Sequence, residues 1–130
     1  LGIEGSRTLV QRAADNARLN GLGERARFEA QDLFRMDADT WRALGKFDRV
    51  LIDPPREGAL EVSKAIAEQH TQSPELSPAR IVYVSCNPAT LARDSGVLVH
   101  VGGYRLTGAG AINMFPHTSH VESIAVFDRP

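Results

Sequence analysis

The spacing of apolar and polar positions divides the chain into alternating strand-like and helix-like stretches. Short apolar runs, rich in β-branched or aromatic side chains, predict strands at residues 26–30, 47–52, 81–84 and 121–127. Apolar positions three or four residues apart predict helices at residues 6–19, 60–69 and 88–101. Alternation of this kind predicts an α/β fold, with a mostly parallel sheet and helices on both of its faces.

The ends of the chain and its glycine-rich part complete this picture. Residues 1–4 have the pattern of the last part of a strand, and Ser6 is the expected N-cap of the first helix, which Asn20 and Gly21 end. Residues 102–113 contain several glycines and no strand is predicted there. Because the chain begins without methionine, inside what looks like a strand, residues 1–130 are expected to be one partial domain of a longer protein.

Four chemically active side chains follow the predicted strands. Glu4, Asp32, Asp53 and Cys86 each stand where a strand gives way to a turn or a helix. In parallel α/β sheets, ligands bind outside the carboxyl ends of the strands. The sequence therefore predicts an active site at this edge of the sheet.

Cys86 is the only cysteine of the chain and a candidate nucleophile. Backbone N–H groups and the positive end of a helix dipole favour an anion at a helix start, so a thiol there ionises more easily than a free cysteine. The alternative is that Cys86 is a small buried hydrophobe. A single cysteine also excludes an internal disulfide and fits a reducing compartment.

Two further segments carry candidate groups. After Asp53, two prolines stiffen the backbone and would hold the carboxylate in a fixed pose, and Arg56 could bind a phosphate or a carboxylate. The alternative for this segment is a rigid turn capped by the aspartate. Glu122 could act as a general base if the fold brings it beside Cys86; otherwise it is a charge on an edge strand. His117 and His120 have a metal-ligand spacing but no third ligand, so no metal site is expected.

Length and charge limit the classes of function. A chain of 130 residues with 42% hydrophobic content is enough for one compact domain and too short for two. A net charge of −1 gives no overall attraction to nucleic acid, so an RNA substrate would need a local basic patch or a further domain. Without a signal peptide or an apolar run of membrane-spanning length, we expect a soluble, cytoplasmic protein.

Three motifs together resemble those of the RNA (uracil-5-)-methyltransferase family. They are residues 53–56 (DPPR), 85–94 (SCNPATLARD) and 114–123 (MFPHTSHVES), and they occur in the order that the family has. The similarity spans nearly the whole chain. Within the family it is strongest to the enzymes that methylate uridine in 23S ribosomal RNA.

The resemblance implies a Rossmann-like methyltransferase fold, S-adenosylmethionine as cofactor and RNA as substrate. The cysteine matching Cys86 adds to C6 of uracil, which activates C5 for methyl transfer, and the base matching Glu122 removes the C5 proton. Glu4 matches the residue that binds the cofactor ribose, Asp32 the residue near the adenine, and Asp53 lies between cofactor and target base. The substrate contacts implied are Asp53, Arg56, Asn87 and His117.

Some parts of the family pattern are absent from these residues. The glycine-rich loop of the first, central strand and the N-terminal RNA-binding domain are missing. We therefore expect a sheet without its first strand, weak cofactor binding by residues 1–130 alone, and no activity from them alone.

Four other functions stay open. A transfer RNA could replace ribosomal RNA as the substrate of the same chemistry. An RNA cytosine-5 methyltransferase also uses cysteine addition, but has a second cysteine in the motif matching residues 53–56. An amino-methyltransferase acting on adenine would need no cysteine and has an aromatic residue at the position of Arg56. The fourth alternative is a non-catalytic RNA-binding module.

Overall fold

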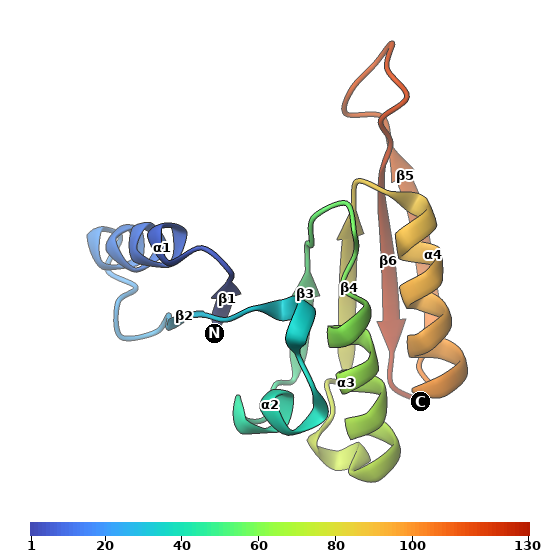
Figure 1. Ribbon diagram of the computed structural model, residues 1–130, viewed down its shortest axis with the longest axis horizontal. Helices are drawn as coiled ribbons and strands as arrows, with labels where there is room; N and C mark the ends of the chain where they lie inside the picture. Colours follow the sequence, from blue (N-terminus) through green and yellow to red (C-terminus); the bar gives the residue numbers. More distant parts are fainter. The chain divides into compact units, whose positions relative to one another are not determined.

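The computed structural model describes residues 1–130, which form two compact units, Leu1–Arg35 and Met36–Pro130. Figure 1 shows both units along the chain. Each unit has strands and helices of its own.

The first unit is a strand–helix–strand element. Strand β1 (Gly2–Glu4) leads into helix α1 (Arg7–Leu19), and β2 (Phe28–Ala30) pairs parallel to β1 before a short 3₁₀ turn, η1 (Leu33–Arg35). As predicted, the Ser6 side chain caps the helix by accepting a hydrogen bond from the Leu9 N–H at 3.4 Å. The helix ends at Asn20, and Gly21 follows with a φ of +70°, a conformation that glycine adopts without strain.

The second unit contains the remaining elements in strand–helix alternation. They are, in order, α2 (Ala38–Ala43), β3 (Arg49–Ile52), α3 (Leu60–Gln72), the 3₁₀ turn η2 (Pro74–Leu76), β4 (Arg80–Ser85), α4 (Pro88–Gly96), the π-helical continuation η3 (Val97–Val101), β5 (Arg105–Ile112) and β6 (Glu122–Asp128). Every predicted strand and helix is found, with bounds within a few residues of those expected. Strand β5 was not predicted, because it contains the glycine-rich segment.

The four strands of this unit form a sheet in the order β3-β4-β6-β5. Strands β3 and β4 are parallel, while β6 lies antiparallel between β4 and β5. Three of the four strands therefore run in one direction, which confirms the predicted α/β class with a mostly parallel sheet. Strand β3 pairs only with β4, and its other edge has no partner strand in this unit.

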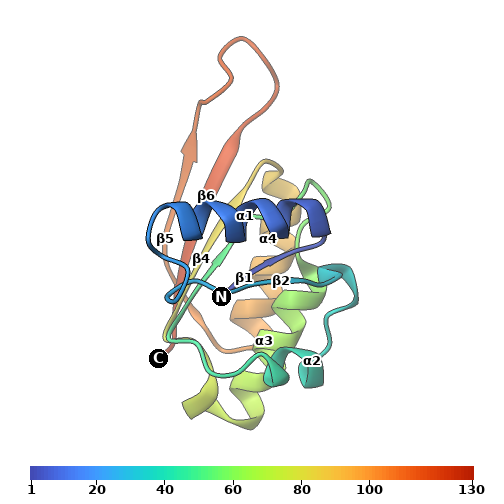
Figure 2. The same ribbon diagram turned by 90° about the vertical axis from the view of Figure 1, so that its left-hand side faces the viewer.

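Helices α3 and α4 cover one face of this sheet (Figures 1 and 2). Alternate residues of β4 and β6 point toward these helices and are buried, among them Ile81, Tyr83 and Phe127, each with 0% exposure. The intervening residues lie on the opposite face, where Leu51 of β3 remains 70% exposed. Helices were predicted on both faces of the sheet. Within this unit they are found on one face, that of α3 and α4.

Polar contacts anchor the end of the unit far from the carboxyl ends of β3 and β4. The Trp41 indole N–H donates to the Gln69 side chain at 2.7 Å, which joins α2 to α3 inside the core. The Tyr104 hydroxyl, only 1% exposed, donates to the carbonyl of Pro78 at 3.0 Å. No helix in the chain combines the length and the hydropathy needed to cross a membrane.

Candidate active site

Three of the predicted functional groups meet at one edge of the four-stranded sheet. Asp53 follows the last residue of β3, Cys86 follows the last residue of β4, and Glu122 begins β6. Because β3 and β4 are parallel and β6 is antiparallel to β4, these positions all belong to the same end of the sheet. The strand ends thus gather a thiol and two carboxylates.

Cys86 and Glu122 flank the last residue pair between β4 and β6. The last paired residues are Ser85 and Ser123, and the Ser123 hydroxyl donates to the Ser85 carbonyl at 3.1 Å. Cys86 directly follows Ser85, and Glu122 directly precedes Ser123. The two residues expected to act together therefore stand at the same end of adjacent strands, next to the last pair of the ladder.

Cys86 is held at a tight strand-to-helix junction. The Ser85 hydroxyl accepts from the Asn87 N–H at 3.1 Å and donates to the Asn87 carbonyl at 3.0 Å. Pro88 then takes the first helical position of α4, where a missing N–H is not needed. The Cys86 side chain is half-buried and its thiol is free of any disulfide, so it is confined by its neighbours and still accessible.

The prolines after Asp53 lead into a loop, residues 53–59, that folds back onto α4. The Gly58 N–H donates to the Pro55 carbonyl at 2.9 Å and closes the turn. Asp53 itself is exposed and takes no part in the hydrogen bonds that hold this loop. Its carboxylate is therefore presented to solvent at the strand end, and the alternative role of a turn cap is not observed.

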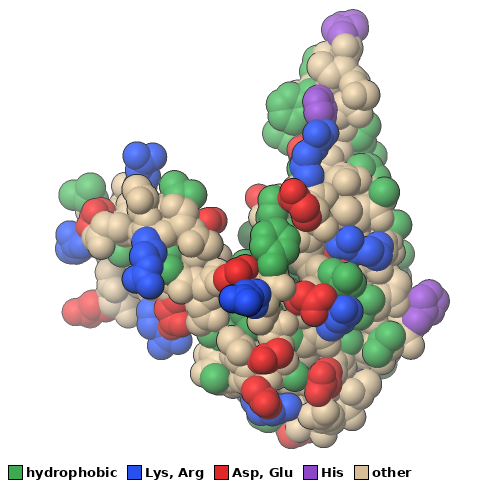
Figure 3. Space-filling model, in the orientation of Figure 1, with side chains coloured by type: hydrophobic (Ala, Val, Ile, Leu, Met, Phe, Trp, Pro, Cys, Tyr) green, Lys and Arg blue, Asp and Glu red, His purple; other side chains and the backbone are tan.

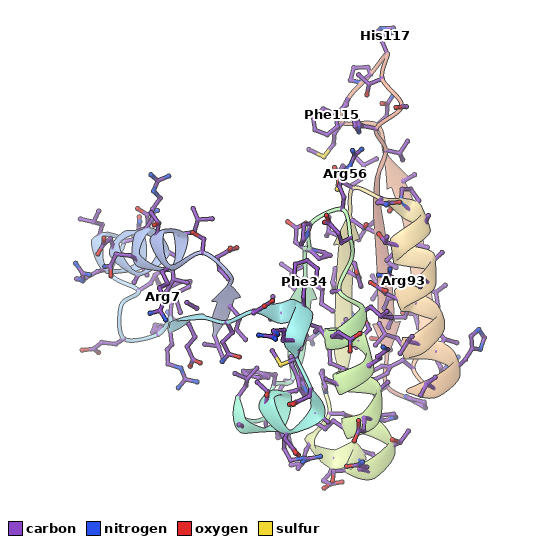
Figure 4. The ribbon with its side chains drawn as sticks, in the orientation of Figure 1. Arg7, Phe34, Arg56, Arg93, Phe115 and His117 are labelled. Atoms are coloured by element: carbon purple, nitrogen blue, oxygen red, sulfur yellow. The ribbon has the colours of Figure 1, made fainter.

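Asn87 and Arg56, two of the predicted substrate contacts, bind each other. The Asn87 side chain accepts from the Ala89 N–H at 3.1 Å as the N-cap of α4, and its amide donates to the Arg56 carbonyl at 3.1 Å. The Asn87 side chain thus uses both of its polar atoms within the protein. The Arg56 guanidinium reaches away from this contact toward the hairpin between β5 and β6, whose end we name the hairpin tip, residues 113–121 (Figure 4).

The hairpin tip meets Arg56 through a histidine that the sequence did not single out for this role. The Arg56 guanidinium donates to Nδ1 of His120 at 2.8 Å, and the His120 ring packs edge-on against Phe115 with centroids 6.2 Å apart. His117, the histidine expected to contact substrate, lies at the far end of the tip, exposed and with a φ of +64°. No side-chain group of three or more His, Cys, Asp or Glu comes together as a metal site.

Exposed apolar side chains make the hairpin tip unusual for a surface. Met114 is 60% exposed, Phe115 48% and Val121 39%. In the space-filling view of Figure 3, apolar and histidine side chains stand out along this projection, with basic side chains directly below it. The pairing of β5 with β6 places these residues beyond the end of the sheet. Local sequence patterns do not predict this pairing.

The two carboxylates expected to bind cofactor stand at neighbouring strand ends of the first unit. Glu4 ends β1 and accepts from the Ser6 N–H at 2.9 Å, whereas Asp32 follows β2 and accepts from the Phe34 N–H at 3.0 Å. Each hydrogen bond uses one carboxylate oxygen, and both side chains are exposed. Phe34, which sequence reasoning passed over, is 56% exposed beside Asp32. Exposed carboxylates and an aromatic ring suit the hydroxyl groups and flat base of a nucleoside.

Comparison with known proteins agrees with these motifs. A sequence model of the tRNA (uracil-5-)-methyltransferase family matches residues 24–129. The chain is 63% identical over 129 residues to the 23S rRNA (uracil(1939)-C(5))-methyltransferase RlmD of Cupriavidus pinatubonensis, with 99% of this chain and 28% of the relative covered. The RlmD protein of Ralstonia nicotianae is 64% identical over 132 residues, with 99% of this chain and 29% of the relative covered.

Solved structures give the same result for the fold. The Pyrococcus abyssi tRNA (uracil-54, C5)-methyltransferase, in complex with S-adenosyl-L-homocysteine, superimposes with a TM-score of 0.73 at 32% identity, over 97% of this chain and 28% of that one. The magnesium protoporphyrin IX methyltransferase of Synechocystis has a TM-score of 0.61 at 18% identity, over 99% of this chain and 58% of the other, and shows the shared fold alone.

The matches cover a small part of the relatives but most of this chain. The chain spans 28–29% of the length of the curated relatives that it matches. The family model, in contrast, covers 106 of the 130 residues, counting from 24 to 129, and includes all three motifs. On these matches, the chain belongs to the tRNA (uracil-5-)-methyltransferase family.

Proposed function

We propose that this chain is the catalytic part of an enzyme that methylates C5 of a uridine in 23S ribosomal RNA. The observation that supports the proposal is the register of β4 and β6, whose last pair, Ser85 and Ser123, is directly adjacent in the chain to Cys86 and Glu122. The identity of 62–64% to RlmD proteins supports the ribosomal substrate. In the proposed enzyme, the RNA-binding domain and the cofactor glycine loop are supplied by parts outside these 130 residues.

Cys86 and Glu122 divide the chemistry between them. The C5 atom of uracil is a poor nucleophile, so the Cys86 thiolate first forms a bond to C6, which makes C5 electron-rich. S-adenosylmethionine supplies the methyl group that C5 then receives. The Glu122 carboxylate takes the C5 proton, the electrons of that C–H bond rebuild the C5=C6 double bond, and the Cys86 sulfur leaves with the electrons of its bond to C6.

The other predicted residues hold the two ligands. The oxygens of Glu4 and Asp32 that make no hydrogen bond with the chain can accept from ribose hydroxyls and from the adenine amino group, and the exposed ring of Phe34 offers a flat apolar surface. Asp53 faces the target base, with Arg56 and His117 as contacts for RNA phosphates or neighbouring bases. Asn87 acts in this scheme through the Arg56 carbonyl that it binds.

A fluorinated substrate tests the proposal directly. Uridine with fluorine at C5 allows addition and methyl transfer but has no C5 proton to lose, so the enzyme stays bound to the RNA. We expect the full-length protein containing this sequence to form a covalent complex with 5-fluorouridine RNA, and Cys86→Ala to form none. Glu61→Gln, a surface change on α3, serves as the matched control and should retain the complex. A complex that persists in Cys86→Ala contradicts the mechanism and leaves a non-catalytic binding module as the alternative.

Transfer RNA is the second candidate substrate, because the P. abyssi relative with 32% identity is a tRNA enzyme. Methyl incorporation into an unmodified 23S transcript and into an unmodified tRNA transcript separates the two. If methyl incorporation into the tRNA is faster by more than about tenfold, the ribosomal assignment is wrong. A factor of ten in rate corresponds to about 1.4 kcal/mol of discrimination between the two substrates.

A further inference from the structure

Asp94 is a buried carboxylate whose role neither the motif nor the proposed chemistry explains. It lies on α4 with 0% exposure. One oxygen, Oδ2, accepts from the Tyr83 hydroxyl at 2.5 Å and from the Ala59 N–H at 2.8 Å, and the other, Oδ1, accepts from Nε of Arg93 at 2.8 Å. Removing a carboxylate from water is expensive unless it is fully hydrogen-bonded, and here each oxygen has a donor.

The partners of Asp94 are held in the protonated states in which they can donate hydrogen bonds to it. Burial, together with the hydrogen bond to Asp94, raises the pKa of Tyr83, so its phenol keeps the proton that it donates. The hydrogen bond to Asp94 raises the pKa of Arg93. The Ala59 N–H also lies 2.8 Å from the Tyr83 hydroxyl oxygen, so Tyr83 and Asp94 converge on one backbone amide.

Side chains of α4 and of its N-cap hold the loop that follows Asp53 through further hydrogen bonds. The Arg56 carbonyl accepts from Asn87 at 3.1 Å and from the Thr90 hydroxyl at 3.2 Å. The Glu57 carbonyl accepts from Nη2 of Arg93 at 2.8 Å. Asn87, Thr90 and Asp94 are three and four residues apart, which places them on one face of α4. The motif of residues 85–94 therefore presents its polar face to the loop.

Gly58 shows how closely the loop and α4 approach. Its φ is +81°, and a Cβ added there would lie 2.6 Å from Oδ2 of Asp94 and 2.8 Å from Nη2 of Arg93. Only glycine satisfies both the backbone conformation and the contact. The loop is therefore held close against α4, the helix that begins two residues after Cys86.

We propose that Asp94 is a positioning residue which, through Tyr83 and Arg93, locks residues 56–59 onto α4 and so fixes Asp53 and Arg56 relative to Cys86. The inference rests on the proposed function above. It adds Asp94, which positions the residues proposed to contact the RNA. A misplacement of about 1 Å in a catalytic constellation slows reaction by up to about 10²-fold.

Tyr83→Phe is the sharpest test, because it removes one hydroxyl from the network. The matched control is Tyr104→Phe, which removes an equally buried hydroxyl that binds the Pro78 carbonyl instead. In the full-length protein, we expect Tyr83→Phe to slow covalent trapping by 5-fluorouridine RNA at least about tenfold, with RNA affinity within about threefold of wild type. Alkylation of Cys86 by iodoacetamide should keep its rate, since the thiol itself is untouched. Asp94→Asn should have the same effect or a larger one.

Hydrogen exchange of the amides of residues 56–60 provides a second readout that does not depend on activity. We expect exchange there to rise in Tyr83→Phe and to stay at the wild-type level in Tyr104→Phe. Equal trapping rates in the two variants, or equal exchange, would overturn the inference. If wild-type protein formed no adduct at all, the proposed function would be what fails, and the exchange comparison would still decide whether Tyr83 and Asp94 hold the loop.

Discussion

Arg56 and His120 are 64 residues apart in the chain and are joined by a hydrogen bond of 2.8 Å. Because an arginine side chain can only donate, Nδ1 of His120 is the acceptor in this contact. The bond links the loop after β3 to the hairpin tip. It is the single polar side-chain contact between those two segments, so each segment limits the motion of the other.

His120→Ala should release the hairpin tip without unfolding the protein. Both partners are exposed, so we expect the free energy of unfolding to change by less than about 0.5 kcal/mol. Limited proteolysis and hydrogen exchange of residues 112–121 should both accelerate. His117→Ala, at the far end of the same tip, is the control and should leave the exchange of these residues unchanged; equal acceleration in both variants would contradict the role given to His120.

Glu122→Gln should uncouple methyl transfer from product release. In the proposed mechanism the carboxylate acts only after C5 has been methylated, so the amide variant should still form the bond between Cys86 and C6. With unmodified uridine RNA, we expect the covalent complex to accumulate and turnover of the full-length protein to fall by about 10²–10⁴. Gel analysis of the denatured complex and single-turnover methyl transfer measure the two steps. Normal turnover would remove Glu122 from the mechanism.

Gly58→Ala should destabilise the protein more than a change at a glycine of similar backbone conformation in open space. Gly45 has a φ of +103° with no atom within 4 Å of an added Cβ, whereas at Gly58 the Cβ would meet Asp94 and Arg93. We expect about 1–2 kcal/mol of backbone strain in both variants and about 1–3 kcal/mol more at Gly58 from overpacking. Urea unfolding of the two variants measures the difference. Equal destabilisation would show that the loop can withdraw from α4.

His70 should make the protein less stable as the pH falls. Burial lowers the pKa of His70, and the positive charge of Arg129 lowers it further. The folded state therefore favours the neutral ring, so this contribution to stability is present above the unfolded pKa, about 6.5, and is lost as pH falls toward the folded value.

Urea midpoints between about pH 7.5 and pH 5.5 test this expectation for His70, in a range above the ordinary pKa values of the carboxylates. His70→Gln should flatten the decline of stability toward low pH, because the group that titrates is gone. His100→Gln, at an exposed position on η3, should leave the decline as it is in wild type. A decline of the same slope in all three proteins would assign the pH dependence to other groups.

The sequence predicted those elements whose signal is local. The apolar run before Cys86, the cap at Ser6 and the stop at Asn20 depend on neighbouring residues, and all three were predicted correctly. Strand β5 was missed because Gly108 and Gly110 disfavour a strand by themselves; they are held in one by pairing with β6, opposite Val126 and Ile124. Pairing across the chain is a property of the fold that local patterns do not contain.

The same distinction applies to the site. Strand ends are visible in a sequence, so the amino-acid pattern alone is enough to nominate Asp53, Cys86 and Glu122. Contacts between distant segments leave no such pattern. The Arg56–His120 bond and the convergence of Asp94 and Tyr83 on Ala59 join residues up to 64 positions apart. The bond from the Asn87 amide to the Arg56 carbonyl is a further contact of this kind.

Strand β6 is the last strand along the chain and occupies an interior position of the sheet, between β4 and β5. During synthesis from the N-terminus, β3, α3, β4 and α4 are all made before it. In a nascent chain Cys86, the proposed nucleophile, is therefore made while residues 122–128 are still missing, and β5 has no strand to pair with until they are made. Glu122 reaches its place only when β6 closes the sheet. The pairing that completes the sheet therefore also brings Glu122 to the end of the sheet where Cys86 stands.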